Sequence, residues 1–395
     1  MRSLIITIIT MAVVTTVTTA IPQFSALSGN RCTNCHISPS GGGIRNELGW
    51  YSWYDVGMVP RNSPLLSWMY ELDKENTFFD GLLTLGMDAR IQSTRSFSSP
   101  DAQRSTFPMQ ASLYAAITPI KAVTIEGTFN IAALRTGPNS DQRIVYPGQR
   151  MGSLSAIIAP SLSWPQLRVG LFRPSIGMRY DDHTMAAFSY ATSSRRQTLV
   201  APDWSEYGAE ITYEGLRWLT LQSGVFGSEG LSQVRLSDGG SQNVSAIAGN
   251  QPTITARAVV WPRAFNDMLN MWFGASILSN DAFMLSSAFA GIGLSDELSL
   301  LIDRTTLDRR DIMETESWTA ELMYQASTWA FPYVRAERYW TRQAAAQSSV
   351  SANAAIIGAQ IFVVPYVELR PEYRIWDTEL DGYTSRWNLQ LHIFY

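Results

Sequence analysis

The amino-acid sequence predicts an all-β protein, in which one antiparallel barrel of about 16 strands follows a small, partly helical N-terminal segment. Three observations support this prediction. Apolar and polar residues alternate along many segments, short and long connections alternate along the chain, and the last residue is the aromatic Tyr395. Together they favour a barrel that crosses a bacterial outer membrane over a soluble β-sandwich.

Residues 1–20 have the features of a secretory signal peptide. Arg2 supplies a positive charge, an uncharged apolar run covers 4–17, and small residues precede the expected cleavage after Ala20. The run is short for a membrane-spanning helix, which needs about 20 apolar residues, and no later stretch approaches that length. The sequence therefore predicts export and a mature chain that begins near Ile21.

The next segment, 21–76, contains the only two cysteines of the chain, Cys32 and Cys35, in the motif Cys-Thr-Asn-Cys-His. In such a motif both thiols add to the vinyl groups of a haem, and the following histidine, His36, ligates the iron. A disulfide framework needs more cysteines, a redox pair needs a βαβ context, and a zinc site needs further Cys or His nearby. The motif therefore predicts one covalent haem c.

Two residues are candidates for the iron ligand opposite His36. Met58 lies in the same segment, and Met–His ligation is common in c-type cytochromes, although packing alone would also explain a methionine. His183 follows Asp181 and Asp182 in a long connection on the expected outer side. These three residues could also bind an extracellular cation such as Fe(II), with an ordinary solvated turn as the competing interpretation.

From residue 77 to 395 the sequence has the period of two that β-strands require. Near the C-terminus, for example, Glu368, Arg370, Glu372 and Arg374 would share one strand face. Four charges on one face suit a wet lumen, with the apolar face turned toward lipid. The predicted strands are 82–92, 106–118, 121–134, 150–163, 166–176, 204–215, 216–228, 251–262, 266–279, 282–293, 296–305, 313–327, 328–341, 352–363, 365–376 and 384–395.

The connections between these segments alternate in length. They are short after even-numbered segments, as near Pro119, and mostly long and polar after odd-numbered ones, as in 93–105 and 177–203; a short connection near Asn280 is the exception. Short periplasmic turns and longer outer loops are typical of outer-membrane barrels. We therefore expect outer-membrane lipid around the barrel. The net charge of −4 argues against nucleic acid as a partner.

With its parts in this order, the chain resembles the fused outer-membrane monohaem cytochrome c–porin family of the iron-oxidising type. The resemblance rests on the Cys-Thr-Asn-Cys-His motif, with Pro39 and glycines close behind it, and on the barrel that follows. It implies that Cys32, Cys35 and His36 hold the haem. It also implies an electron-transfer protein that takes electrons from an extracellular donor and passes them to a soluble periplasmic cytochrome or another carrier. If the donor is Fe(II), the protein would be an iron-oxidising oxidoreductase.

Two other functions stay open at this point. A diffusion porin could carry the haem segment as a tethered periplasmic electron carrier, and it would then conduct ions freely. A soluble periplasmic cytochrome with a β-sandwich would fractionate without detergent. The expected organisation is a signal peptide at 1–20, a monohaem cytochrome c segment at 21–76, lying on the periplasmic side or inside the barrel, and an outer-membrane β-barrel at 77–395.

Overall fold

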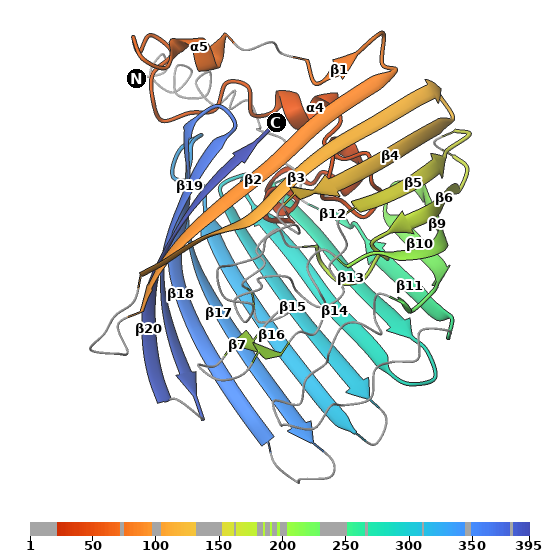
Figure 1. The fold of residues 1–395 in the computed structure, drawn as a ribbon, viewed down its shortest axis with the longest axis vertical. Coiled ribbons are helices and arrows are strands. Elements are labelled where there is room, and N and C mark those ends of the chain that lie inside the picture. The colour runs from red at the N-terminus through yellow and green to blue at the C-terminus, as the bar shows by residue number, and fades with distance from the viewer. Residues whose placement is uncertain are drawn as a thin grey trace.

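A closed antiparallel β-barrel of 16 long strands makes up most of the chain that the structure describes (Figure 1). The structure is a computed structural model. It describes residues 22–71, 75–96, 104–131, 152–161, 163–179, 185, 190–191, 196–197, 204–229, 251–264, 268–309, 312–343, 349–379 and 382–395. The expected signal peptide, 1–20, lies outside the described residues.

Each barrel strand pairs with the next one along the chain, and the last strand pairs with the first. The strands are β2 (Leu83–Ser96), β3 (Arg104–Ile120), β4 (Val123–Asn130), β5 (Gly152–Ile158), β6 (Gln166–Phe172), β9 (Glu206–Leu216), β10 (Leu219–Phe226), β11 (Thr253–Val260), β13 (Leu269–Ser279), β14 (Met284–Leu294), β15 (Leu298–Arg309), β16 (Met313–Tyr324), β17 (Ala330–Gln343), β18 (Ser349–Val364), β19 (Val367–Thr378) and β20 (Gly382–Phe394). The ring closes where Asp88 to Ser96 pair with Phe394 to Arg386. The predicted antiparallel barrel of about 16 strands is confirmed.

Four short strands complete the described sheet structure. They are β1 (Thr77–Phe78), which pairs with β2; β12 (Arg263–Ala264), which pairs with β13; and β7 (Tyr190–Ala191) and β8 (Arg196–Gln197), which pair with each other.

The two faces of the barrel wall are reversed relative to a soluble protein. On β19 the charged row from Glu368 to Arg374 is buried inside, as its alternation predicts. Large apolar side chains point outward instead: Leu322 is 41%, Val334 is 49% and Ile357 is 64% exposed. An apolar exterior around a polar interior is the arrangement that suits a barrel in lipid.

One end of the barrel carries the short turns, and we call it the short-turn end. The turns 121–122, 217–218, 295–297 and 365–366 lie there, as do the C-terminus and the helices α4 (Glu47–Tyr51) and α5 (Ser67–Tyr70) (Figure 1). At Tyr366, φ is +64°, which lets one residue reverse the chain between β18 and β19. Since short turns face the periplasm in outer-membrane barrels, this end is the periplasmic one if the chain follows that rule.

Several strand boundaries differ from those that the sequence predicts. β2 continues to Ser96 and β3 already begins at Arg104, because these polar residues keep pairing with the long neighbouring strands. β6 ends at Phe172 rather than at 176. Pro174 follows, and the Ser175 amide and hydroxyl donate to the Glu210 carboxylate, so the chain turns away from the sheet.

Four short helices precede the barrel: α2 (Pro22–Ser28), α3 (Cys32–Cys35), α4 (Glu47–Tyr51) and α5 (Ser67–Tyr70). α2 packs on the inner face of β13, β14 and β15. Residues 22–56 lie largely inside the barrel, and we call them the lumen segment. In the described part of the chain, no helix has the length and apolar character needed to cross a membrane.

Aromatic rings fill the space between the lumen segment and the wall. Phe24 packs edge-on against Trp53 and Phe331, with ring centroids 5.6 and 4.8 Å apart. Trp53 in turn contacts Phe362 at 4.0 Å and Phe394 at 5.7 Å. All five rings are at most 3% exposed, so the lumen segment and the strands share one core.

Candidate haem site in the barrel lumen

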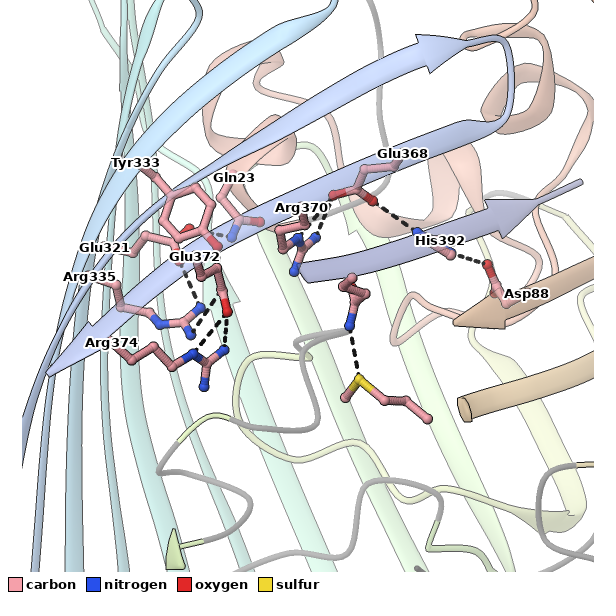
Figure 2. A network of polar contacts seen from close by, with 12 residues as sticks. Gln23, Asp88, Glu321, Tyr333, Arg335, Glu368, Arg370, Glu372, Arg374 and His392 are labelled. Atoms are coloured by element: carbon pink, nitrogen blue, oxygen red, sulfur yellow. Dashed lines mark hydrogen bonds and ion pairs between the residues drawn. The ribbon is translucent and has the colours of Figure 1, made fainter. Parts of the chain in front are cut away.

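The lumen segment is bonded to the barrel wall on several sides. Its partners come from strands around the ring: Asp88 on β2, Arg168 on β6, Glu214 on β9, Asn270 on β13 and Glu321 on β16. Figure 2 shows one of these bonds, in which the Gln23 amide donates to Glu321 over 2.5 Å. The segment therefore bridges the lumen.

The cysteine motif forms the single turn of α3. A helical spacing of three places Cys32 and Cys35 on the same face, and the His36 amide closes the turn on the Cys32 carbonyl over 2.9 Å. Gly49 is in α4, directly against this turn. A Cβ at Gly49 would overlap the Cys35 carbonyl oxygen, so only glycine permits this approach.

A glycine also lies beside the motif on its other side. Gly41 has a φ of +78°, and a Cβ there would lie 3.2 Å from the Cys32 sulfur and 3.9 Å from the His36 ring. The glycines that the sequence shows after the motif therefore allow the chain to fold back over it.

The His36 ring is held in one orientation. The side chain is 5% exposed, and its Nδ1 lies 3.3 Å from the Ile44 carbonyl oxygen. Because a carbonyl can only accept, Nδ1 carries the proton, which puts the lone pair of the neutral ring on Nε2. A histidine that ligates a metal usually has its other nitrogen held in this way.

No disulfide joins Cys32 to Cys35. Burial raises the pKa of Cys32, and burial together with the nearby Cys32 raises the pKa of Cys35 to about 11. A reactive dithiol needs the opposite shift, toward the thiolate. The environment thus argues against the redox-pair interpretation of the motif and is compatible with thioether attachment.

A cavity of about 40 Å³ adjoins Cys32. It is lined by apolar groups (Met178, Val259, Trp261 and Trp272), by charged groups (Arg31, Arg179, Glu214 and Arg257), and by Cys32 and Gly41 with their neighbours. The indole Nε1 of Trp272 is buried without a hydrogen-bond partner in the described structure and lies against Gly291 of β14.

The chain after β6 forms part of this cavity. Gly177 is fixed from two sides, because its amide donates to the Ser276 hydroxyl over 2.7 Å and its carbonyl accepts from Arg257 over 3.1 Å. Arg179 then donates to the Gly41 carbonyl over 2.6 Å. The sequence predicts that 177–203 is an outer loop. Residues 177–179 lie inside the barrel instead, because these bonds draw them against the lumen segment.

The remaining candidate residues are placed as follows. Met58 is 45% exposed, its amide donates to the Phe362 carbonyl over 2.8 Å, and it is absent from the lining of the cavity beside Cys32. Asp181, Asp182 and His183 lie outside the described residues. Within the described part of the chain, no group of three or more His, Cys, Asp or Glu side chains is arranged to hold a metal ion.

Sequence reasoning missed Met178, which is 5% exposed and lines the cavity. No motif or periodicity marks this residue. Only its position in the folded barrel distinguishes it from the other methionines.

A network of buried charges connects the lumen segment to the wall (Figure 2). His392 lies between two carboxylates, with Nδ1 2.9 Å from Glu368 and Nε2 2.9 Å from Asp88. Glu368 also accepts from Arg370, and Asp88 lies 3.6 Å from Arg45 of the lumen segment. The charged row on β19 thus points into the lumen, where it takes part in fixing the segment.

The fold is that of a porin-type β-barrel. One similar solved structure is OprB of Pseudomonas putida, with a TM-score of 0.55, 10% identity, and coverage of 80% of this chain and 95% of that chain. Another is the outer membrane channel DcaP of Acinetobacter baumannii, with a TM-score of 0.50, 11% identity, and coverage of 79% of this chain and 97% of that chain. No protein-family model and no curated protein sequence matches the chain. At such low identity the likeness shows the fold alone.

Proposed function

We propose that this chain is an outer-membrane electron-transfer protein with one haem c, bound to Cys32, Cys35 and His36 inside the barrel. Electrons pass from an extracellular donor, for which Fe(II) is the first candidate, to a soluble periplasmic cytochrome or another carrier. The observation that carries the proposal is the position of the Cys-x-x-Cys-His turn in the barrel lumen, where the residues on either side of it are bonded to the wall.

The residues around the cavity fit a haem. His36 has its Nδ1 held by a carbonyl, as expected of an iron ligand. Arg31, Arg179 and Arg257 border the cavity, and guanidinium groups bind carboxylates such as the haem propionates well. When bound, the haem supplies one-electron redox chemistry, and burial in the barrel tunes its potential.

The position of the site suits transfer across an outer membrane. The lumen segment lies toward the short-turn end, where a periplasmic acceptor could approach. A donor such as Fe(II) would then give up its electron without entering the cell. The oxidised product would stay outside.

The alternative is a diffusion porin with a tethered haem carrier. A tethered domain would hang below an open pore, whereas the lumen segment shares an aromatic core and buried ionic contacts with the wall. We therefore favour a conduit over an open pore. In planar bilayers the conduit should show little ion conductance, and a tethered carrier should show a large one.

The test uses the full-length protein, produced in a host that attaches haem c and then placed in liposomes. It should contain one haem per chain, and the double variant Cys32→Ala/Cys35→Ala should form the barrel without covalent haem. Fe(II) added outside should reduce the haem bands of the wild type at acidic or neutral pH. A folded wild-type barrel without haem would refute the proposal, and haem that Fe(II) does not reduce would remove iron from the donors.

A further inference from the structure

We propose that the exposed side of α4 and of the turn after it is the docking site for the periplasmic electron acceptor, and that this acceptor is a soluble carrier with a basic, lysine-rich surface. The inference rests on the proposed function and names its partner. The site consists of Glu47, Leu48, Tyr51 and Asp55, which are all exposed, and we call it the α4 face. Helix α4 lies at the short-turn end (Figure 1).

The other side of α4 packs into the barrel. Gly49 lies against the Cys35 carbonyl, and the Trp50 ring stacks on Tyr366 with centroids 5.0 Å apart. Successive helical residues are turned by about 100°, so the exposed residues of α4 lie opposite these two. The α4 face is thus about one helix diameter, roughly 10 Å, from the Cys-x-x-Cys-His turn. One electron would pass from the ferrous haem to the oxidised carrier docked there.

The chain around the α4 face carries an excess of negative charge. Residues 46–82 contain six carboxylates and two basic side chains, a balance of −4. In the described part of this range, Arg61 is the only basic side chain, and it is paired with Asp55. The carboxylates described there are all exposed: Glu47, Asp55, Glu71, Glu75 and Asp80.

The barrel turns at the same end do not cancel this excess. The basic residues Lys121 and Arg217 are matched by the acidic residues Asp296 and Glu297. The short-turn end therefore presents a negative surface where the α4 face is exposed. Such a surface repels anionic lipid headgroups and acidic proteins, and it attracts and orients a basic protein before contact.

The α4 face has an apolar centre and a charged rim. Leu48 is 47% and Tyr51 is 48% exposed, and the carboxylates of Glu47 and Asp55 accompany them. Apolar centres with polar rims are typical of protein interfaces, and tyrosine is enriched in them. A small face of this kind suits the weak, short-lived complexes that electron carriers form. The shape of the charge and the apolar centre together favour a basic soluble protein as the occupant.

The test measures, by isothermal titration calorimetry, the binding of a lysine-rich cytochrome c to the purified full-length protein in detergent. The same cytochrome with acetylated lysines is the matched probe, because acetylation removes the positive charges and keeps the haem. The wild type should bind the basic probe and bind the acetylated probe much more weakly. Its affinity should fall as salt rises from about 0.01 to about 0.15 M, where the screening length drops from about 30 to about 8 Å.

Three variants locate the site. Glu47→Lys replaces an attraction with a repulsion of similar size and should weaken binding by about twofold to thirtyfold. Tyr51→Ala removes part of the apolar centre and should weaken binding by about fivefold or more. Glu297→Lys is the matched control, because it makes the same charge change at an exposed position on the β14–β15 turn, and it should bind as the wild type does. A heat-modifiability gel checks that each variant is folded.

The inference is overturned if neither probe binds, if both bind equally, or if Glu47→Lys and Glu297→Lys weaken binding equally. A wild-type dimer that Glu47→Lys dissociates also overturns it, since the face would then bind a second copy. The haem-free variant Cys32→Ala/Cys35→Ala should bind the probe normally but exchange no electron with it. A wild type that lacks haem yet binds in the expected pattern would refute the proposed function and support the docking site.

Discussion

Replacing Gly293 with alanine tests whether the lumen segment is docked as the structure shows. Gly293 lies on the inner face of β14, directly under α2. A Cβ there would overlap the Ala26 carbonyl oxygen and lie 2.5 Å from its carbon and 3.0 Å from the Leu27 Cα. These are backbone atoms, so no side chain can swing aside, and α2 itself must move.

The size of the effect follows from the contacts of α2. Overpacking of this kind costs about 1–3 kcal/mol. A shift of α2 also weakens the 2.6 Å hydrogen bond from Asn270 to the Leu27 carbonyl, which is worth about 0.5–1.5 kcal/mol. The sum is about 1.5–4.5 kcal/mol, which at 1.4 kcal/mol per factor of ten disfavours docking by about tenfold to a thousandfold.

Single-channel recording in planar bilayers measures this change. The fraction of time that Gly293→Ala spends at porin-like conductance should rise by a factor in this range over the wild type. Gly127→Ala on β4 is the matched control, because its Cβ would make only ordinary contacts, at 3.4 Å and beyond. If both variants and the wild type show the same open fraction, the docking of α2 under Gly293 is wrong.

Three further substitutions examine other contacts of the lumen segment. Arg45→Leu removes the guanidinium that lies 3.6 Å from the buried Asp88 carboxylate. The free energy of unfolding should fall by about 3–5 kcal/mol, which lowers the urea midpoint. An unchanged midpoint would show that the ion pair is unimportant. Gly49→Ala places a methyl group against the Cys35 carbonyl. This variant should show a lower ratio of haem to protein in a pyridine haemochrome assay. A normal ratio would contradict the tight packing of α4 on the motif. Trp53→Ala empties the centre of the aromatic core and should lower the free energy of unfolding by about 3–5 kcal/mol. Its thermal midpoint should therefore fall well below that of Trp53→Phe. Equal midpoints would contradict this role of Trp53.

The barrel could be predicted from the sequence because its signals are local. Alternation with a period of two assigns Glu368, Arg370, Glu372 and Arg374 to one face, and the structure places all four inside. Alternating connection lengths gave the even strand number and located the short turns. Such patterns depend on neighbours a few residues apart, so they can be recognised without knowledge of the fold.

The end of β6 could not be predicted in the same way. The residues after Phe172 continue a plausible strand pattern, but the Glu210 carboxylate on β9 binds Ser175 and ends the strand. A contact between residues 35 positions apart overrides the local preference here. The same turn brings the chain into the lumen, where the sequence predicts an outer loop.

The sequence by itself predicted a haem site at Cys32, Cys35 and His36, and it predicted a barrel of about 16 strands and the inward face of those strands. All of these depend on spacings of a few residues. Only the tertiary structure decided that the motif lies inside the barrel and that Met178 borders the same cavity. The bond between Arg179 and Gly41 joins residues 138 positions apart, and no local period encodes such an approach. It arises because the barrel closes around the lumen segment and brings distant parts of the chain into one polar interior.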